Sequence, residues 1–198
     1  MPKKVDHRQR REAIARALWR VVDQQGVAQA TMREVAQEAG ISLGQLQHYF
    51  GSRTALLTFA MDFAAEQRSL RVQNRLHRLG REPHPRDILA LMLTELLPLQ
   101  TDSRASSRMS AAYVLEALHD RELRDQAGED LRHARARLEE LIRTAIADGH
   151  IEAHRDPGTE TDLLLALTGF TTLLELGVVQ PEGALSAIDA HLDRLFAP

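Results

Sequence analysis

The stretch Thr31–Arg53, TMREVAQEAGISLGQLQHYFGSR, is where the fold of this 198-residue chain can first be predicted. Its apolar residues recur at helical spacing on both sides of a glycine. Val35 and Ala36 belong to the first group, and Leu46 and Phe50 belong to the second. The pattern therefore predicts two short helices that meet at a sharp corner.

The ends of these two helices are marked by capping residues. Thr31 precedes the first apolar residues and Glu34 follows three positions later, which is the spacing of a capping box. Gly40 stands where a helix C-terminus takes the left-handed conformation, and Ser42 can cap the next helix through its side-chain oxygen. Two capped helices around a glycine corner make a helix-turn-helix, whose second helix lies in the DNA major groove.

The same stretch resembles the DNA-binding domain of the TetR family of bacterial repressors. The residues that carry the resemblance are Thr31, Ala39, Gly40, Ile41, Ser42, Gly44, Tyr49, Phe50 and Arg53. The chain departs from the family pattern at Gln47, where a tyrosine usually contacts a phosphate. Near the other end, EGALSAIDAHLDRLF resembles the C-terminal domain of the choline-responsive, BetI-like branch.

The resemblance implies two sets of DNA contacts. The residues implied to meet base edges are Arg33, Leu43, Gly44 and Gln45. Those implied to bind phosphates are Thr31, Gln47, Tyr49 and Arg53. Gln45 can pair bidentately with adenine and Arg33 with guanine, so these two are expected to specify the sequence while the phosphate contacts position the protein.

Composition favours an all-α fold and a cytoplasmic protein. Hydrophobic residues make up 43% of the chain and aromatic residues only 4%. The chain has no cysteine, which excludes disulfides and thiolate chemistry. No apolar run approaches the roughly 18 residues of a membrane span, and the start MPKKVDHRQRR lacks the apolar core of a signal peptide.

The net charge of −3 is distributed unevenly. Residues 1–54 hold nine Lys or Arg against five Asp or Glu, which leaves 16 against 23 for residues 55–198. A basic N-terminal part followed by an acidic remainder is typical of a protein that binds DNA at one end. The basic residues before the helix-turn-helix form either a phosphate-binding arm or a solvated terminus: Lys3, Lys4, Arg8, Arg10 and Arg11.

Apolar periodicity predicts about nine helices in two domains. Besides the helix-turn-helix, the expected helices are 6–25, 53–79, 87–100, 104–119, 120–147, 159–178 and 181–196. Residues 1–54 are the expected DNA-binding domain, with 53–79 as the connecting helix. The stretch GREPHP at 80–85 stops that helix, so residues 80–198 are the expected ligand-binding and dimerisation domain.

The last two expected helices carry more apolar surface than a helix covered on one side needs. The helix 159–178 alone contains seven leucines and a phenylalanine. A helix-turn-helix that reads palindromic DNA also needs two-fold symmetry. Together these observations predict a homodimer through residues 159–178 and 181–196.

A cavity for a small-molecule effector is expected in the C-terminal domain. Its candidate lining residues are Met92, Leu96, Met109, Tyr113, Glu116, Phe170 and Leu174. Glu116 would face a cationic ligand, and the alternative for these residues is an ordinary position at the edge of the core. A quaternary ammonium effector is conceivable from the BetI-like resemblance, yet the body has few aromatics for a cation cage, so the effector stays open.

No catalytic or cofactor motif stands out. The chain has no Gly-rich phosphate loop, no G-x-S-x-G and no HExxH pair, so no catalytic residue and no cofactor is expected. A metal site in the loop DGHIEAHRD at 148–156 is the minor alternative to a solvated loop. The leading hypothesis is a ligand-responsive repressor. The alternatives are an enzyme body fused to a DNA-binding head and a ligand-independent DNA-binding protein.

Overall fold

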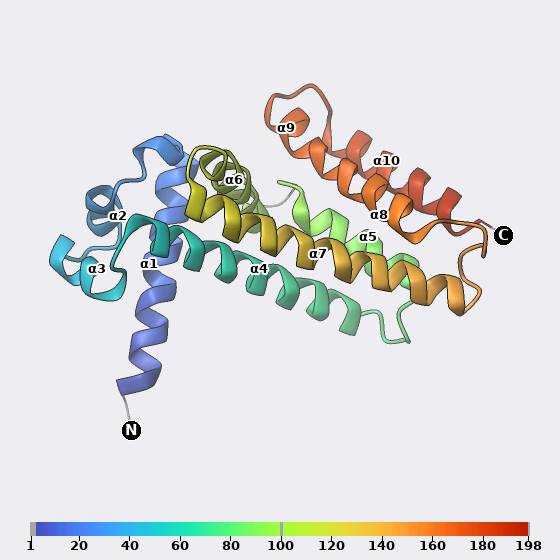
Figure 1. Cartoon of the computed structure of the whole chain (residues 1–198), viewed down its shortest axis with the longest axis horizontal. Helices are drawn as coiled ribbons and strands as arrows, with labels where there is room; N and C mark the ends of the chain where they lie inside the picture. Colours follow the sequence, from blue (N-terminus) through green and yellow to red (C-terminus); the bar gives the residue numbers. More distant parts are fainter. Residues whose placement is uncertain (1–2, 100, 198) are drawn as a thin grey trace. The chain divides into compact units, whose positions relative to one another are not determined.

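In the computed structural model of the chain, all the regular secondary structure of the described residues is helical (Figure 1). It describes the backbone of residues 3–99 and 101–197, and the side chains of these residues except 3–6, 28, 101 and 102. The helices are α1 (Lys3–Gln25), α2 (Met32–Glu38), α3 (Leu43–Tyr49), α4 (Arg53–His77), α5 (Pro85–Leu96), α6 (Thr101–Ala117), α7 (Arg121–Ala147), α8 (Pro157–Ala166), α9 (Phe170–Glu175) and α10 (Pro181–Leu195). The predicted all-α fold is confirmed, and none of the described helices is long and apolar enough to cross a membrane.

The helix predicted over 159–178 is interrupted rather than absent. A 3-10 turn at Leu167–Gly169 separates α8 from α9, and the backbone there stays right-handed, with φ −58° and ψ −19° at Gly169. Thr168 contributes to this more tightly wound turn, because its hydroxyl donates a hydrogen bond to the Leu165 carbonyl at 2.7 Å. If α8 and α9 are counted as one helix, the described residues form the nine helices expected.

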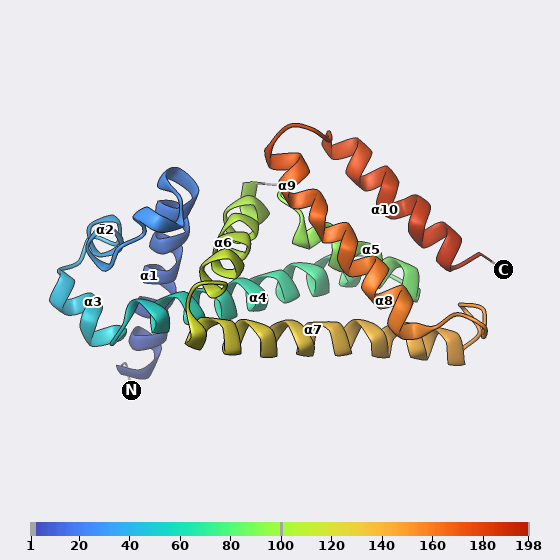
Figure 2. The ribbon, with the colours of Figure 1, turned by 45° about the horizontal axis from the view of Figure 1, so that its top comes forward.

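The chain divides into two compact units. The first contains Met1–Gln67 and Arg104–Ala127, and the second contains Arg68–Ser103 and Gly128–Pro198. This division differs from the predicted domains, because α6 and the start of α7 belong with the helix-turn-helix. The uninterrupted helices α4 and α7 therefore each contribute residues to both units (Figure 2).

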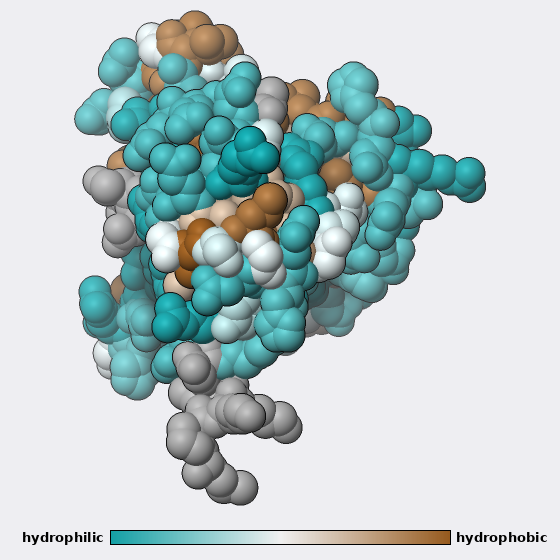
Figure 3. Space-filling view, turned by 90° about the vertical axis from the view of Figure 1, so that its left-hand side faces the viewer, coloured by the Kyte–Doolittle hydropathy of each residue, from teal (hydrophilic) through white to brown (hydrophobic). Residues whose placement is uncertain are grey.

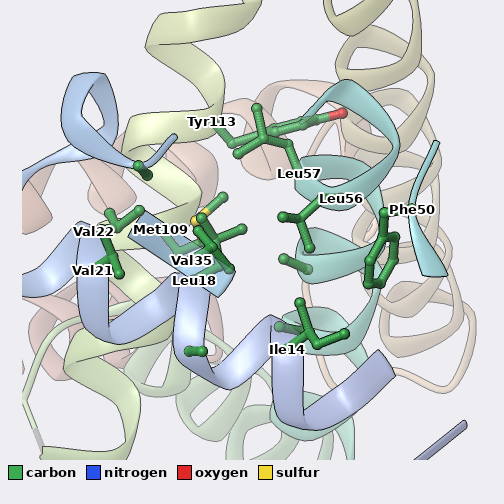
Figure 4. Close-up of a cluster of buried hydrophobic side chains, with 14 of the residues drawn as sticks. Ile14, Leu18, Val21, Val22, Val35, Phe50, Leu56, Leu57, Met109 and Tyr113 are labelled. Carbon is green, nitrogen blue, oxygen red and sulfur yellow. The ribbon is translucent and has the colours of Figure 1, made fainter. Parts of the chain in front are cut away.

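The core of the first unit shows why α6 belongs there. An apolar stripe on α1, which includes Ile14 and Leu18, packs with residues from α2, α3, α4 and α6 (Figure 4). From α6, Met109, Tyr113 and Ala117 recur every four residues and are 0–3% exposed. Arg108 on α6 also bonds to the Asp23 carboxylate at 2.7 Å. This apolar face and this ion pair thus help to attach α6 to the N-terminal unit.

The second unit has its own core and an uncovered apolar surface. Leucines and isoleucines of α5, α7, α8 and α10 form the core, among them Leu89, Ile142, Leu164 and Ile188. Several large apolar side chains of the last helices remain 36–72% exposed: Leu163, Leu173, Leu176, Val178 and Leu185. The excess apolar surface predicted for this part of the chain is therefore present in the protomer.

Candidate nucleic-acid interface

The start of α2 carries half of the predicted capping box. Thr31 Oγ1 accepts a hydrogen bond from the Glu34 amide at 3.2 Å. The Glu34 carboxylate bonds to the Thr31 hydroxyl instead of the Thr31 amide. That amide already donates to the Gln29 carbonyl at 2.8 Å, because a 3-10 turn at Val27–Gln29 precedes it. The Thr31 cap is therefore present. The Thr31 amide, however, takes its hydrogen-bond partner from the preceding turn and not from Glu34 as the sequence pattern predicted.

The corner and the start of α3 follow the sequence prediction closely. Gly40 has φ +66°, the left-handed conformation that disfavours residues with a Cβ. Its neighbour Ile41 donates to the Ala36 carbonyl at 3.0 Å and so ends α2. Ser42 and Gln45 then form a complete capping box, each side chain bonding to the other residue's amide at 3.1 Å.

This geometry turns one side of α3 to solvent. Leu46 and Phe50 are buried, whereas Gly44, Gln45 and Gln47 are exposed. On and before α2, Arg33 and Thr31 are also exposed, and Leu43 and Tyr49 are half-buried. Figure 3 views the protein from the side on which α2 and α3 lie, where hydrophilic residues dominate. All eight predicted DNA contacts therefore keep some exposure to solvent, and Arg53, like Leu43 and Tyr49, is half-buried.

His48 is an exposed residue of α3 that the sequence prediction missed. It lies one turn after Gly44, and its ring centroid lies 5.7 Å from that of Tyr49. The family pattern does not include this position. It includes only the two aromatic residues that follow it. Helical spacing from Gly44 is the signal that would have identified it.

The half-buried Arg53 side chain bonds to other parts of the protein, which differs from the phosphate contact predicted for it. Its Nη1 bonds to the Glu116 carboxylate at 2.7 Å. Its Nε donates to the Ala30 carbonyl at 3.2 Å and its Nη2 to the Val27 carbonyl at 3.0 Å. The guanidinium thus joins α4, the segment before α2, and α6. The geometry argues against a phosphate contact by Arg53 and against a ligand contact by Glu116.

The basic residues of α1 also have partners within the protein. Arg8 bonds to Glu12 at 3.0 Å and to Glu66 at 2.6 Å. The Arg11 guanidinium lies over the Phe59 ring, 4.1 Å from its centroid. Arg8 and Arg11 therefore make contacts within the protein, which disagrees with the phosphate-binding arm considered for them. Arg10 is exposed, and the side chains of Lys3 and Lys4 lie outside the described residues.

The predicted effector-lining residues divide between the two units. Met109 and Tyr113 are buried in the core of the first unit, where Glu116 bonds to Arg53. The other four are half-buried residues of the second unit: Met92, Leu96, Phe170 and Leu174. The structure therefore does not gather the seven in one of its two apolar clusters.

The loop considered as a metal site has other partners. Asp156 caps α8 by accepting from the Thr159 amide at 2.7 Å, and this bond holds the pKa of Asp156 below its usual value. Glu152 pairs with His154 at 3.5 Å, and the His150 ring lies 4.6 Å from that of His84. Over the described part of the chain, no three potential ligands converge on one point.

Two family models match the chain, one at each end. Residues 14–58 match the model of bacterial regulatory proteins of the tetR family, and residues 85–197 match the C-terminal model of BetI-type transcriptional repressors. The chain belongs to the TetR family. The resemblance found in the sequence is thereby confirmed, and this TetR-family chain is a transcriptional regulator.

Named relatives and solved structures agree with this assignment. The HTH-type transcriptional regulator PksA of Bacillus subtilis is 34% identical over 78% of this chain and 77% of its own. BetI of Vibrio vulnificus is 30% identical over 63% of this chain and 62% of its own.

The solved structures show the same fold. A TetR-family regulator from Rhodococcus sp. has a TM-score of 0.84 at 22% identity, covering 96% of this chain and 100% of that one. A regulator from Saccharomonospora viridis, solved in complex with choline, has a TM-score of 0.75 at 20% identity over 94% and 95% of the two chains. At these identities the likeness extends to the fold alone.

Proposed function

We propose that this TetR-family regulator binds a palindromic operator as a homodimer in the cytoplasm, represses transcription there, and leaves the DNA when a small-molecule effector binds. The observation that carries the proposal is the solvent-facing side of α3, with Gly44 and Gln45 exposed at its capped N-terminus. Recognition helices of this motif contact base edges with their N-terminal residues. Gly44 has no side chain to hold the helix away from the groove.

The DNA contacts divide by role. Arg33, Gln45 and His48 are the exposed side chains proposed to meet base edges, with Leu43 and Gly44 allowing close approach. Thr31, Gln47 and Tyr49 are proposed to bind phosphates. Arg53 is left out of this set, because its guanidinium is bonded to Glu116 and two backbone carbonyls.

Dimerisation is supported by the exposed apolar side chains of the second unit. Leu163, Leu176 and Leu185 are 47%, 72% and 37% exposed in the protomer. Grouped apolar surface of this kind usually marks an interaction site. A second copy of the chain is the proposed occupant, since reading a palindrome needs two heads related by two-fold symmetry.

Release of the operator needs an effector that binds one conformation better than the other. Two features support a mechanical route through the chain. The single helix α4 begins in the first unit and ends in the second, and within the first unit α6 is bonded to the start of α4 through Glu116 and Arg53. A shift of either helix would move the recognition helix.

Gln45→Ala is expected to relax sequence preference at one base pair per half-site. Loss of a bidentate pair with adenine should cost on the order of 1–3 kcal/mol on the cognate duplex and much less on a scrambled one. The substitution also removes the hydrogen bond that the Ser42 amide donates to Gln45 Oε1, so the free energy of unfolding should fall by about 1 kcal/mol. Fluorescence anisotropy on both duplexes and urea unfolding measure the two effects separately.

A matched control is Gln24→Ala, which removes the same side chain from an exposed position on α1. Binding by this variant should equal that of the unmodified protein on both duplexes. If Gln45→Ala weakens cognate and scrambled binding equally, Gln45 does not specify sequence, and His48→Ala becomes the variant that has to show the preference.

A further inference from the structure

A cluster of arginines lies around one buried carboxylate in the second unit. Arg68, Arg71 and Arg75 recur at helical spacing on α4, and Glu95 stands near the end of α5. Arg71 Nε donates to Glu95 Oε2 at 2.6 Å, and Arg75 Nη1 donates to Glu95 Oε1 at 3.0 Å. The Glu95 side chain is only 3% exposed. Both of its oxygens are therefore occupied by arginine.

The two arginines bonded to Glu95 carry one positive charge more than that single carboxylate neutralises. The Nη2 atom of Arg71 is buried and makes no hydrogen bond. Burial, and then the neighbouring charge of Arg71, lower the pKa of Arg68 to about 10, which still leaves it charged at neutral pH. At neutral pH a buried guanidinium keeps its proton and therefore its positive charge, so an added anion would be strongly stabilised here.

We propose that this cluster holds the anionic head of the effector, a carboxylate or phosphate group bound by the free edge of Arg71 with Arg68 and Arg75 beside it. The planar guanidinium presents its N–H groups in a fork that matches either oxyanion. The inference rests on the proposed function, since it names the chemical class of the molecule that regulates the protein.

The neighbouring residues of α5 suit an apolar body attached to that head. Met92 precedes Glu95 by three residues and shares a helical face with Leu96, and both side chains are half-buried. They are two of the residues expected from the sequence to line the effector site. The effector is thus an amphipathic acid, with its oxyanion at Arg71 and its hydrocarbon against Met92 and Leu96.

The second unit offers little to a cationic effector. Among the described side chains of this unit, the buried carboxylates are Glu95, held by two arginines, and Glu160, which bonds to Arg155 at 3.0 Å. Its aromatic residues, Trp, Tyr and Phe together, are Phe170 and Phe196 alone. A quaternary ammonium is best recognised by several aromatic faces around it, and two phenylalanines supply fewer than such a cage uses.

Calorimetric titration of the full-length protein with four matched amphiphiles tests this inference. Decanoate, decyl phosphate, decanol and decyltrimethylammonium share one hydrocarbon chain and differ in the head group. One or both acids should bind, and they should bind at least about tenfold tighter than decanol, because charge-assisted hydrogen bonds are added. Decanoate and decyl phosphate distinguish a carboxylate from a phosphate head. Equal binding of decanol, tighter binding of the ammonium, or no binding of either acid would overturn the inference.

Two substitutions should shift acid binding in opposite directions. Arg71→Gln should weaken binding of the preferred acid by about tenfold or more, because it removes the proposed donor. Glu95→Gln should tighten it, because it removes the anion that competes for Arg71 and Arg75. Arg78→Gln, which removes one charge from an exposed position just beyond α4, should leave binding unchanged.

A purely structural ion pair predicts a different pattern, in which both variants only lower the melting temperature and acid affinity moves in neither direction. Should either variant fail to fold, the amphiphile series on the unmodified protein still decides. Operator binding measured without amphiphile separates the two proposals. If the protein binds its operator and no acid, the proposed function stands and this inference is overturned. If it binds acid and no DNA, the inference stands and the proposed function is overturned.

Discussion

Replacing Leu163 and Leu185 together with glutamate is expected to turn the homodimer into folded monomers and to lower operator affinity at least about a hundredfold. Both side chains are partly exposed in the protomer, at 47% and 37%, and lie on α8 and α10. Four leucines per dimer would lose on the order of 1 kcal/mol each, and four carboxylates would be buried opposite them. Sedimentation velocity and anisotropy on the operator measure the two effects.

Leu131→Glu is the matched control, because Leu131 is 56% exposed on α7, outside the last helices. It should remain dimeric and bind the operator normally. A double variant that stays dimeric at micromolar concentration would contradict the proposed interface. An unmodified protein that sediments as a stable monomer would contradict the dimer itself.

Arg53→Ala is expected to loosen the attachment of α6 to the helix-turn-helix and to weaken operator binding strongly, leaving a residual affinity that can be measured. It removes one charge-assisted bond and two bonds to backbone carbonyls, which together should lower the free energy of unfolding by about 2–4 kcal/mol. For a domain of this size that corresponds to a fall in melting temperature on the order of 10 °C. Calorimetry and anisotropy at two salt concentrations report stability and binding.

The salt dependence separates the two roles available to Arg53. If Arg53 bound a phosphate, its removal would lower the salt slope of binding by about one per subunit. A structural role predicts that the residual binding keeps its slope while stability falls. Arg33→Ala is the opposite case, since Arg33 is exposed on α2: stability should hold and sequence preference should relax. A stable Arg53→Ala variant with a reduced slope would restore the phosphate role.

The helix-turn-helix could be predicted residue by residue because its determinants are local. The cap of Ser42 on Gln45 and the left-handed Gly40 each depend on residues within a few positions. The same locality explains the good agreement of most helix ends. Within the helix-turn-helix, the error concerns the partner of Glu34 at the start of α2, and it arose because the 3-10 turn before Thr31 was not foreseen.

Contacts between distant segments were beyond the sequence patterns. Arg53 and Glu116 are separated by 63 residues, and periodicity alone could assign neither a partner. For the same reason α6 was placed in the C-terminal domain, although its buried face of Met109 and Tyr113 was visible in the sequence.

The arginines of α4 illustrate the same limit. In the sequence the later part of this helix reads as a basic and polar connection. Its partner Glu95 stands 24 residues beyond Arg71, across the turn that contains Gly80. Only the fold brings the carboxylate to the arginines and shows that the positive charge there exceeds it.

Selection from a pool of randomised duplexes, with binding at moderate salt and sequencing of the retained DNA, shows which sequence the protein reads. We expect an inverted repeat whose half-sites have centres about one helical turn, or a whole number of turns, apart. The Gln45→Ala protein should select the same repeat with one base pair per half-site relaxed. Retained DNA that contains no inverted repeat, or no enriched sequence, would contradict the claim that a dimer reads its operator through α3.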